Sequence, residues 1–238
     1  MILGINTAQT VHELALIDSS KEPAVLITEK TWTDGRRDVE DLVPFLNTLL
    51  EEHGLSKKDI TQIVVVRGPG SFTSLRTGVA FANALAEGLG AQLFSLDTFE
   101  LLRRKAALTD PNSAKRSYRN TVPLSGTPSL VLLHAGGLDV GVFSNDDPVR
   151  VGPLAMILND YPHDKNMHVV AELTETQREE LNPIVQEKKW KLVEGHELLT
   201  MGEMLLTFDL NKLDSNKTVE PYYLKSANIT KSSDPWKK

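Results

Sequence analysis

The sequence predicts an α/β protein made of two halves that follow the same plan. In each half, apolar segments typical of strands come first, and segments that alternate between helix and strand patterns follow. The chain has 238 residues, of which 40% are hydrophobic and 24% are charged, an ordinary composition for a globular protein. This length accommodates one domain or two small ones. The doubled pattern favours two, although the halves are not similar enough to define a repeat.

The first half is predicted to form three strands and then alternating helices and strands. Apolar residues at three- and four-residue spacing predict an amphipathic helix that ends at Gly54, and Pro44 should weaken its first turns. The segment from Ser56 to Asp59 has the form of a capping box, with Asp in place of Glu. The predicted elements are strands at 1–6, 12–20 and 23–32, a helix at 38–53, a buried strand at 62–68, a helix at about 73–89, a strand at 91–96 and a helix at 97–108.

The second half repeats this order after a proline-containing stretch that is poor in aliphatic residues. This stretch, residues 109–128, is the best boundary in the chain and predicts a linker or a functional loop. We therefore expect an N-terminal lobe at 1–108, a C-terminal lobe at 129–225 and a basic tail at 226–238. The predicted elements of the second half are two strands within 129–143, a third strand at 147–153, a helix at 153–161, a strand at 167–172, a helix at 174–186, a strand at 190–195 and a helix at 196–210.

Composition and charge exclude several classes of function. The formal net charge of −6 and a pI near 5.6 argue against a chain that coats a polyanion with its whole surface. Cysteine is absent, which excludes disulfides, thiolate metal ligands and a cysteine nucleophile. The first residues lack a signal-peptide pattern, and no segment approaches the roughly 18 apolar residues of a membrane span. We expect a cytoplasmic protein that does not act on a membrane.

The stretch VVVRGPGSFTSLRTGVAFANALAEGLG joins a predicted strand to a helix through a tight corner. Gly68 and Gly70 accept backbone angles that other residues avoid, and Pro69 fixes its own φ. Ser71 and Thr73 offer hydroxyls at the start of the helix, where free N–H groups can bind an anion. The stretch lacks the lysine of a P-loop, the third glycine of a dinucleotide motif and the Gly-x-Ser-x-Gly order of a nucleophile elbow. A phosphate site and a purely structural corner both stay open.

No set of residues predicts a catalytic or metal site. The six histidines include no pair three or four residues apart that one helix face could present to a metal. The carboxylates are scattered along helix faces, where solvated charge is the ordinary interpretation. Asp18, Asp97 and Asp139 lie near predicted strand ends, and each is more typical of a turn than of an active site.

The helix that follows the corner is apolar nearly all round. Leu75, Val79, Ala82 and Ala86 define one face, and further small or apolar residues cover much of the rest. Such a helix must be covered on both sides. Two interpretations stay open: an interface with another protein, which small side chains would allow to approach closely, and a central helix between the two halves of this chain.

Three motifs together resemble a known family. ILGINTA stands at the N-terminus, RGPGSFTSLRTGVAFANALA follows the buried strand, and EPYYLKSANITK lies near the C-terminus. In content, order and spacing they resemble the bacterial TsaB family, formerly called YeaZ. The resemblance implies a two-lobed fold of the actin-like ATPase superfamily (ASKHA, RNase H-like), each lobe a mixed sheet with flanking helices. It also implies a non-catalytic subunit that binds and activates TsaD, the transferase that makes threonylcarbamoyladenosine at position 37 of tRNA.

The same resemblance implies partners and site residues. The partners are a TsaD-like transferase, a TsaE-like ATPase and, indirectly, tRNA, with a homodimer of the isolated chain as an alternative. No catalytic residue, metal ligand or cofactor of its own is implied, and ATP or ADP with Mg²⁺ would lie at the interface of the complex. The expected partner-binding residues, on two helices and the corner between them, are Val39, Leu42, Val43, Leu46, Gly68, Pro69, Gly70, Ser71, Phe72, Thr73, Leu75, Arg76, Val79, Ala82, Asn83 and Ala86. The nucleotide-binding candidates are Asn6, Thr7, Ser71 and Thr73.

The sequence departs from the family pattern at several positions. Asn6 stands where the family commonly has Asp, and an amide binds Mg²⁺ less well than a carboxylate, so ATP hydrolysis by this chain is not expected. Ser74 replaces the usual Gly, and His134 and Gly136 stand in a segment where many relatives have Asp-Ala-Arg. The alternative functions are an active phosphotransferase of the same superfamily or a glycoprotease-like hydrolase. The basic tail is a candidate contact for tRNA phosphates.

Overall fold

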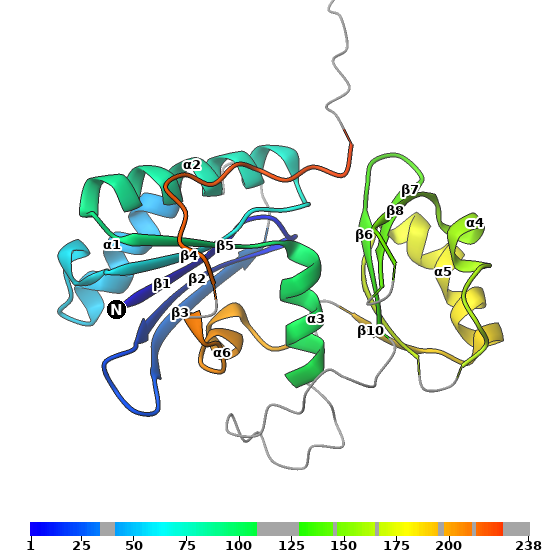
Figure 1. The fold of residues 1–238 in the computed structure, drawn as a ribbon, viewed down its shortest axis with the longest axis horizontal. Helices are drawn as coiled ribbons and strands as arrows, with labels where there is room; N and C mark the ends of the chain where they lie inside the picture. The colour runs from blue at the N-terminus through cyan, green and yellow to red at the C-terminus, as the bar shows by residue number, and fades with distance from the viewer. Residues whose placement is uncertain are drawn as a thin grey trace, which may run out of the picture.

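The structure is a computed structural model of the chain and describes residues 1–33, 41–108, 129–144, 147–164, 167–194, 198–210 and 213–225. It has two lobes, each built on a five-stranded mixed sheet with helices packed beside it (Figure 1). The predicted loop at 109–128 and the predicted tail at 226–238 lie outside the described residues, and so does Val39.

The N-terminal lobe contains the elements predicted for the first half. They are β1 (Ile2–Asn6), β2 (Val11–Asp18), β3 (Val25–Thr33), α1 (Leu42–Glu52), the short 3-10 helix η1 (Lys57–Asp59), β4 (Gln62–Val66), α2 (Phe72–Leu89), β5 (Gln92–Leu96) and α3 (Thr98–Leu108). The strand order is β3-β2-β1-β4-β5. Strands β1, β2 and β3 form an antiparallel meander, and β4 runs parallel to β1 and β5.

The C-terminal lobe repeats this topology. Its elements are β6 (Ser129–His134), β7 (Asp139–Phe143), β8 (Arg150–Pro153), α4 (Leu154–Leu158), β9 (His168–Glu172), α5 (Glu175–Lys188) and β10 (Lys191–Glu194), and α6 (Met201–Leu205) follows. The strand order β10-β9-β6-β7-β8 is the first order read from the other edge, with β6, β7 and β8 as the meander and β9 parallel to β6 and β10. The two-lobed α/β architecture predicted from the doubled sequence pattern is therefore confirmed.

Local sequence signals explain where several elements begin and end. Helix α1 begins at Leu42, so Pro44 lies in the first turn. Backbone N–H groups of the first turn make no hydrogen bond within the helix, so the absence of this group in Pro44 breaks none. Helix α2 ends before Gly90, whose φ of 65° lies in the left-handed region that glycine adopts readily. The predicted capping box is present, because the Asp59 carboxylate accepts hydrogen bonds from the Ser56 backbone N–H at 2.7 Å and from its hydroxyl at 2.8 Å.

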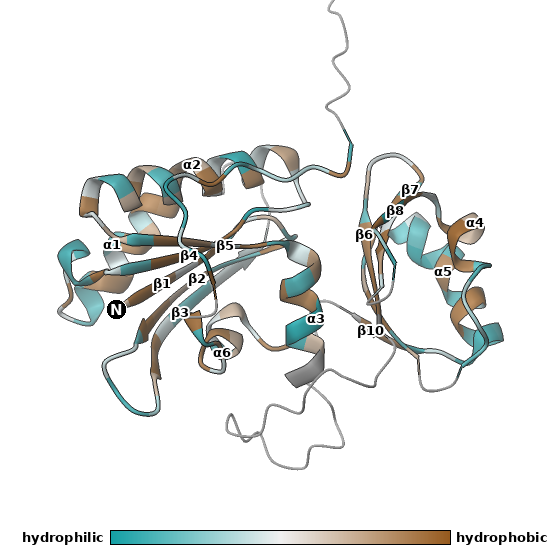
Figure 2. Ribbon diagram, viewed as in Figure 1, coloured by the Kyte–Doolittle hydropathy of each residue, from teal (hydrophilic) through white to brown (hydrophobic). Residues whose placement is uncertain are grey.

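Apolar side chains concentrate in the two sheets and on the helix faces that cover them (Figure 2). Helices α1 and α2 cover one face of the first sheet, and α3 and α6 lie on the other (Figure 1). A third apolar cluster joins the lobes: Phe99 and Leu102 of α3 pack with Val131, Leu133 and Val170 of the second sheet. Helix α3, and not α2, therefore lies between the two halves of the chain. Among the described residues, no helix combines the length and apolar character needed to cross a membrane.

The expected lobe boundary needs one correction, because the chain returns to the N-terminal lobe after β10. The helix expected at 196–210 is shorter, with α6 spanning only Met201–Leu205. The side chains that join the core of the N-terminal lobe from this late part of the chain are Met201, Met204, Leu205, Leu210 and Val219. The described residues 201–210 and 213–219 therefore pack with the N-terminal lobe.

The segment after α6 is held by backbone hydrogen bonds to β5 and to the residue that follows β4. The Asn216 N–H donates to the Leu93 carbonyl at 2.7 Å, and the Tyr222 N–H donates to the Arg67 carbonyl at 2.7 Å. The segment thus passes β5 and continues beside α2 toward the C-terminal lobe (Figure 1). No periodic pattern in this part of the sequence predicts such a path, because the hydrogen bonds use backbone groups.

A buried ion pair connects four elements of the N-terminal lobe. The Lys105 ammonium of α3 lies 3.0 and 2.8 Å from the two Glu13 carboxylate oxygens of β2, and both side chains are 5% exposed. Glu13 also accepts hydrogen bonds from the Met201 N–H of α6 at 2.8 Å and from the Asn6 amide of β1 at 2.7 Å. A buried charge is tolerated when it is paired and its remaining hydrogen-bonding capacity is used, and both conditions hold for Glu13.

Replacement of Lys105 by Met should destabilise the protein by about 3–5 kcal/mol, because Glu13 would remain buried without its counter-charge. Urea unfolding followed by circular dichroism measures this loss. The matched control is Arg150→Met, which breaks the exposed pair of Arg150 and Asp160 and should cost much less. Equal losses in the two variants would contradict a structural role for the buried pair.

A second carboxylate, Glu29 of β3, lies beside this network. It accepts a hydrogen bond from the Gly202 N–H at 3.0 Å. Burial raises the pKa of Glu29 above its ordinary value, and the nearby Glu13 carboxylate raises it further, against the opposing effects of hydrogen bonds from Thr200 and Gly202 and of the Lys105 charge. The folded state therefore binds the Glu29 proton more tightly than the unfolded state does.

The sign of this shift predicts that ionised Glu29 lowers stability. Its contribution to the free energy of unfolding is most favourable below the ordinary pKa and falls as the pH rises through the raised pKa. Glu29→Gln should therefore gain stability relative to the parent chain as the pH is raised from about 4 to about 7, as measured by thermal unfolding. The exposed Glu51→Gln should show no such trend. A stability difference that shrinks as the pH rises would overturn the assignment.

Candidate functional site

The corner between β4 and α2 is tied to two neighbouring segments. Gly68 has a φ of 104°, a conformation that favours glycine. Its carbonyl accepts a hydrogen bond from the Thr98 N–H at 2.8 Å, and the Pro69 carbonyl accepts one from the Thr98 hydroxyl at 2.6 Å. On the other side, the Ser71 N–H donates to the Ala8 carbonyl at 3.0 Å. The corner therefore joins the turn between β1 and β2 to the start of α3.

Two glycines of the motif are required by the close approach of that turn. A Cβ atom on Gly70 would lie 1.9 Å from the Ala8 carbonyl oxygen, and a Cβ atom on Gly78 would lie 2.0 Å from the Thr7 hydroxyl oxygen. Thr7 in turn donates a hydrogen bond to the Ser74 carbonyl at 2.8 Å. The glycines thus let β1 pack directly on the first turns of α2, which supports the structural interpretation of the corner.

Ser74 has a structural role that the sequence does not predict. Its side chain is buried, and its hydroxyl lies 3.3 Å from the hydroxyl of Ser71, the residue that precedes α2. Ser71 makes no side-chain hydrogen bond to the helix N–H groups. The extra hydroxymethyl group of Ser74 therefore fits without steric conflict and engages the side chain that was expected to cap the helix.

The expected docking residues divide into buried and exposed groups. Six of them are at most 6% exposed and belong to the core of their own lobe, which corrects the expectation that they contact a partner directly: Leu42, Leu46, Leu75, Val79, Ala82 and Ala86. Gly68 and Pro69 are buried in the corner. The exposed members of the expected set are Val43, Gly70, Ser71, Phe72, Thr73 and Arg76.

The outer face of α2 is therefore the face available to a partner. Residues at four-residue spacing, Phe72, Arg76, Ala80, Ala84 and Gly88, are all exposed, and we call this row the outer stripe. Its central positions have small side chains, which allow close approach of a facing surface. Figure 1 shows α2 on the outside of the N-terminal lobe, with its first turn toward the C-terminal lobe and its last turns away from it.

One flank of α2 is covered by the returning C-terminal segment. The Asn83 side chain donates to the Val219 carbonyl at 2.9 Å and accepts from the Val219 N–H at 2.8 Å. The Phe72 ring lies 5.0 Å from the Tyr223 ring, measured between centroids. Asn83, expected to bind a partner, thus uses both groups of its amide inside the chain.

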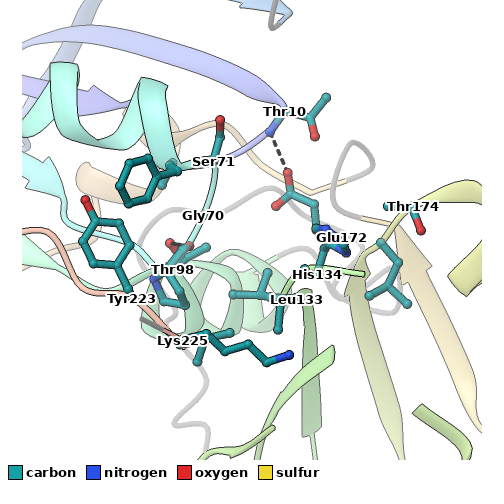
Figure 3. A pocket seen from close by; sticks show the side chains of 17 residues that line it. Thr10, Gly70, Ser71, Thr98, Leu133, His134, Glu172, Thr174, Tyr223 and Lys225 are labelled. Atoms are coloured by element: carbon teal, nitrogen blue, oxygen red, sulfur yellow. Dashed lines mark hydrogen bonds between the residues drawn. The ribbon is translucent and has the colours of Figure 1, made fainter. Parts of the chain in front are cut away.

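A cavity of about 520 Å³ lies between the corner and the C-terminal lobe. The corner contributes Gly70 and Ser71, and the opposite lobe contributes His134 and Glu172 (Figure 3). Figure 3 also shows the hydrogen bond that crosses this cleft, from the Thr10 N–H to a Glu172 carboxylate oxygen at 2.8 Å. A second cavity of about 610 Å³ is also lined by Thr10 and Glu172, together with Glu13 and Lys105.

The four nucleotide-binding candidates do not converge on this cleft. Asn6 is 0% exposed and Thr7 is 1% exposed, and both use their polar groups within the lobe. Thr73 is exposed but does not line the cavity, so only Ser71 does. This arrangement corrects the expected site, and Asn6 and Thr7 do not fit the phosphates and Mg²⁺ of a nucleotide bound there.

The acidic residues considered for catalysis occupy structural positions. Asp18 accepts hydrogen bonds from Ser20, which hold the pKa of Asp18 below its ordinary value. Asp97 accepts from the Glu100 N–H at the start of α3, and Asp139 pairs with Lys225. Within the described ranges, no group of three or more His, Asp or Glu side chains is placed to hold a metal ion.

Sequence reasoning missed the residues that cross the cleft and connect it to the core. Glu172 binds Gln9 and Thr10, which lie 163 and 162 positions away in the sequence, and Lys105 binds Glu13 across 92 positions. No spacing rule covers such distances. The only available signal is the unusual content of polar residues in β1 and β2, where apolar side chains would be ordinary.

In comparison with known proteins, parts of the chain are similar to TsaD and TsaB proteins. Residues 34–126 match the profile of the family described as TsaD: tRNA N6-adenosine threonylcarbamoyltransferase. The tRNA threonylcarbamoyladenosine biosynthesis protein TsaB of Bacillus subtilis is 31% identical over 101 residues, which cover 42% of each chain. TsaB of Escherichia coli is 32% identical over 125 residues, which cover 48% of this chain and 47% of the relative. The matches thus span less than half the length of these relatives.

A solved structure extends the likeness to the whole fold. YeaZ from Pseudomonas aeruginosa is similar with a TM-score of 0.63 and 15% identity, covering 94% of this chain and 99% of the other. At this identity the likeness concerns the fold, and it agrees with the two lobes of repeated topology described above. The chain therefore has the same two-lobed fold as this structure, with one mixed sheet in each lobe.

The glycine contacts predict opposite effects for two similar substitutions in α2. Gly78→Ala should destabilise the protein by about 2 kcal/mol or more, because its Cβ would overlap the buried Thr7 side chain. Gly88→Ala meets nothing within 4 Å and should stabilise the helix by about 0.5–1 kcal/mol. Chemical denaturation of both variants provides the measurement, and equal stability would contradict the close approach of β1 to α2.

Proposed function

We propose that this chain is a member of the TsaB (YeaZ) family, as its partial sequence matches and its fold support, and that it is the non-catalytic subunit of a tRNA-modifying assembly. In this role it binds a TsaD-like threonylcarbamoyltransferase and stabilises the active form of that enzyme. The modification is threonylcarbamoyladenosine at position 37 of tRNA, as the family resemblance implies. The observation that carries the proposal is the exposed outer stripe of α2, located in the part of the chain that matches the TsaD profile.

The location of that match supports an interface between similar lobes. The matched residues 34–126 include α1, α2 and α3, so the N-terminal lobe resembles the corresponding region of a TsaD protein. Two similar lobes can pack face to face about an approximate twofold axis, as subunits of symmetric dimers do. A helix whose exposed positions include Ala80, Ala84 and Gly88 permits a close helix–helix contact of this kind along that part of its length.

The chemistry of the described residues also favours an accessory role. The acids considered for catalysis are used in turns, caps and pairs, and the nucleotide candidates Asn6 and Thr7 are buried. We therefore place any ATP or ADP of the assembly on residues of the partners, a TsaD-like transferase and a TsaE-like ATPase. tRNA would then be bound through the assembly.

The charge of the chain is consistent with this indirect role. A formal net charge of −6 disfavours extended contact with a polyanion, because such binding depends on clustered Lys and Arg. The proposal therefore gives this subunit a protein-binding task and leaves recognition of the tRNA phosphates to other chains.

A charge placed on the outer stripe should weaken the assembly. Ala84→Arg would put an unpaired cation at the centre of the proposed contact and should reduce affinity for the TsaD-like protein of the same genome by about tenfold or more. Isothermal titration calorimetry measures this change. Because Ala84 is exposed, the folded chain should keep its thermal midpoint.

Met156→Arg is the matched control, since Met156 is 69% exposed on α4 of the other lobe. It should leave the affinity unchanged. The proposal fails if the parent chain does not bind the TsaD-like protein at micromolar concentration, or if Ala84→Arg and the control bind equally well. Sedimentation of the isolated chain tests the alternative of a homodimer, which Ala84→Arg should dissociate if the same face is used.

A further inference from the structure

The Glu172 carboxylate joins the C-terminal lobe to the turn between β1 and β2 across the cleft. Glu172, at the end of β9, accepts a hydrogen bond from the Gln9 side-chain amide at 2.6 Å and another from the Thr10 N–H at 2.8 Å. Gln9 and Thr10 form the turn between β1 and β2. This contact lies at the cleft, whereas the apolar packing between the lobes lies at α3. The hydrogen bonds of Glu172 therefore connect the lobes at the cleft, at a point separate from the apolar contact at α3.

The orientation of the Gln9 amide is set by Asn6. The Asn6 NH₂ group donates to the Gln9 side-chain carbonyl at 2.8 Å and to the Glu13 carboxylate at 2.7 Å, while its own carbonyl oxygen accepts from the Ala8 N–H at 3.2 Å. Ionised Glu13 can only accept hydrogen bonds, so the Asn6 NH₂ group must face it. The Gln9 carbonyl must then face Asn6, which leaves the Gln9 NH₂ group to bind Glu172.

The ion pair of Lys105 and Glu13 fixes the start of this chain of hydrogen bonds. Lys105 contacts both Glu13 oxygens, and the Met201 N–H holds one of them. Asn6 is 0% exposed, Gln9 is 7% exposed and Glu13 is 4% exposed, so these groups find most of their hydrogen-bond partners in one another. An unsatisfied polar group in such a site is costly, and the network therefore has one favoured orientation throughout.

We propose that Asn6 sets the polarity of an interlobe latch, defined as the contact of Gln9 and Thr10 with Glu172, and that this latch holds the cleft closed. The inference does not depend on the proposed partner or on tRNA modification. It gives a physical reason for an amide at position 6. An aspartate there would meet the Glu13 carboxylate and would require the Gln9 NH₂ group to turn inward, so the Gln9 carbonyl oxygen would face Glu172 without a hydrogen.

The latch has a direct readout in the exchange of the Thr10 amide hydrogen. Thr10 is an exposed residue whose N–H is held by the Glu172 carboxylate. Hydrogen exchange followed by NMR should therefore show a protected Thr10 amide in the parent chain. Asn6→Asp and Glu172→Ala should each accelerate its exchange by roughly tenfold or more, because a hydrogen bond to a charged acceptor is lost. The Val64 amide in the core strand β4 reports global stability, so the acceleration at Thr10 should exceed any change at Val64 in each variant.

Matched controls separate the latch from general effects of charge and truncation. Asn159→Asp and Glu187→Ala change exposed residues of the C-terminal lobe and should leave Thr10 exchange unchanged. The double variant Asn6→Asp with Glu172→Ala should exchange no faster at Thr10 than Glu172→Ala alone, since both changes remove the same contact. Unchanged Thr10 protection in Glu172→Ala would overturn the latch. Acceleration in Glu172→Ala but not in Asn6→Asp would overturn the role of Asn6.

A distance measurement tests whether the latch holds the lobes together. The chain contains no cysteine, so spin labels can be placed specifically at the exposed positions Thr48→Cys in α1 and Met156→Cys in α4. We expect one narrow distribution of label distances in the parent background and a broader or longer one in Glu172→Ala. An identical distribution in both backgrounds would show that the other contacts between the lobes suffice to hold them and would contradict the latch.

Discussion

The buried contact between Glu13 and Lys105 is the interaction on which the arrangement of the N-terminal lobe depends. It joins β2 to α3 and receives hydrogen bonds from β1 and α6, so four elements meet at one carboxylate. An ion pair buried to this extent is not the most stabilising way to fill a core, and apolar residues often serve as well. The role of this ion pair is to orient its neighbours, because charged groups with fixed partners determine how the adjacent side-chain amides must point. That orientation passes through Asn6 and Gln9 to Glu172 in the other lobe.

In the N-terminal lobe, one side of α2 packs on the lobe and the other side faces outward. Inside, Gly70 and Gly78 allow the β1–β2 turn and strand β1 to approach the start of α2, and Thr98 ties the corner to α3. Outside, Ala80, Ala84 and Gly88 of the outer stripe are exposed, while Phe72 and the flank that carries Asn83 contact the returning C-terminal segment. The Gly-Pro-Gly corner therefore acts as a joint that fixes α2 on the lobe. It presents the exposed side of this helix on a rigid support.

Much of this fold could be predicted from the sequence, because strand and helix periods, turn glycines and the capping box are local signals. The doubled order of strands and helices predicts both sheets, and the motif predicts the corner. Local signals do not show which face of α2 is buried, since apolar residues lie on both faces. They also do not predict the return of residues 201–210 and 213–219, which is fixed by side chains such as Met201 and by backbone hydrogen bonds. The polar network of Glu13, Lys105 and Glu172 depends on contacts between distant positions, which no spacing pattern reveals.

The central claim is that the outer stripe of α2 is the surface through which this chain binds a TsaD-like subunit. Site-specific photo-cross-linking tests it most directly, with a photoreactive amino acid at Ala84 on α2 or at Met156 on α4, both exposed. We expect a cross-link to the TsaD-like protein from position 84 and none from position 156. A cross-link from position 156 alone, or none from position 84 in a complex that demonstrably forms, would contradict it.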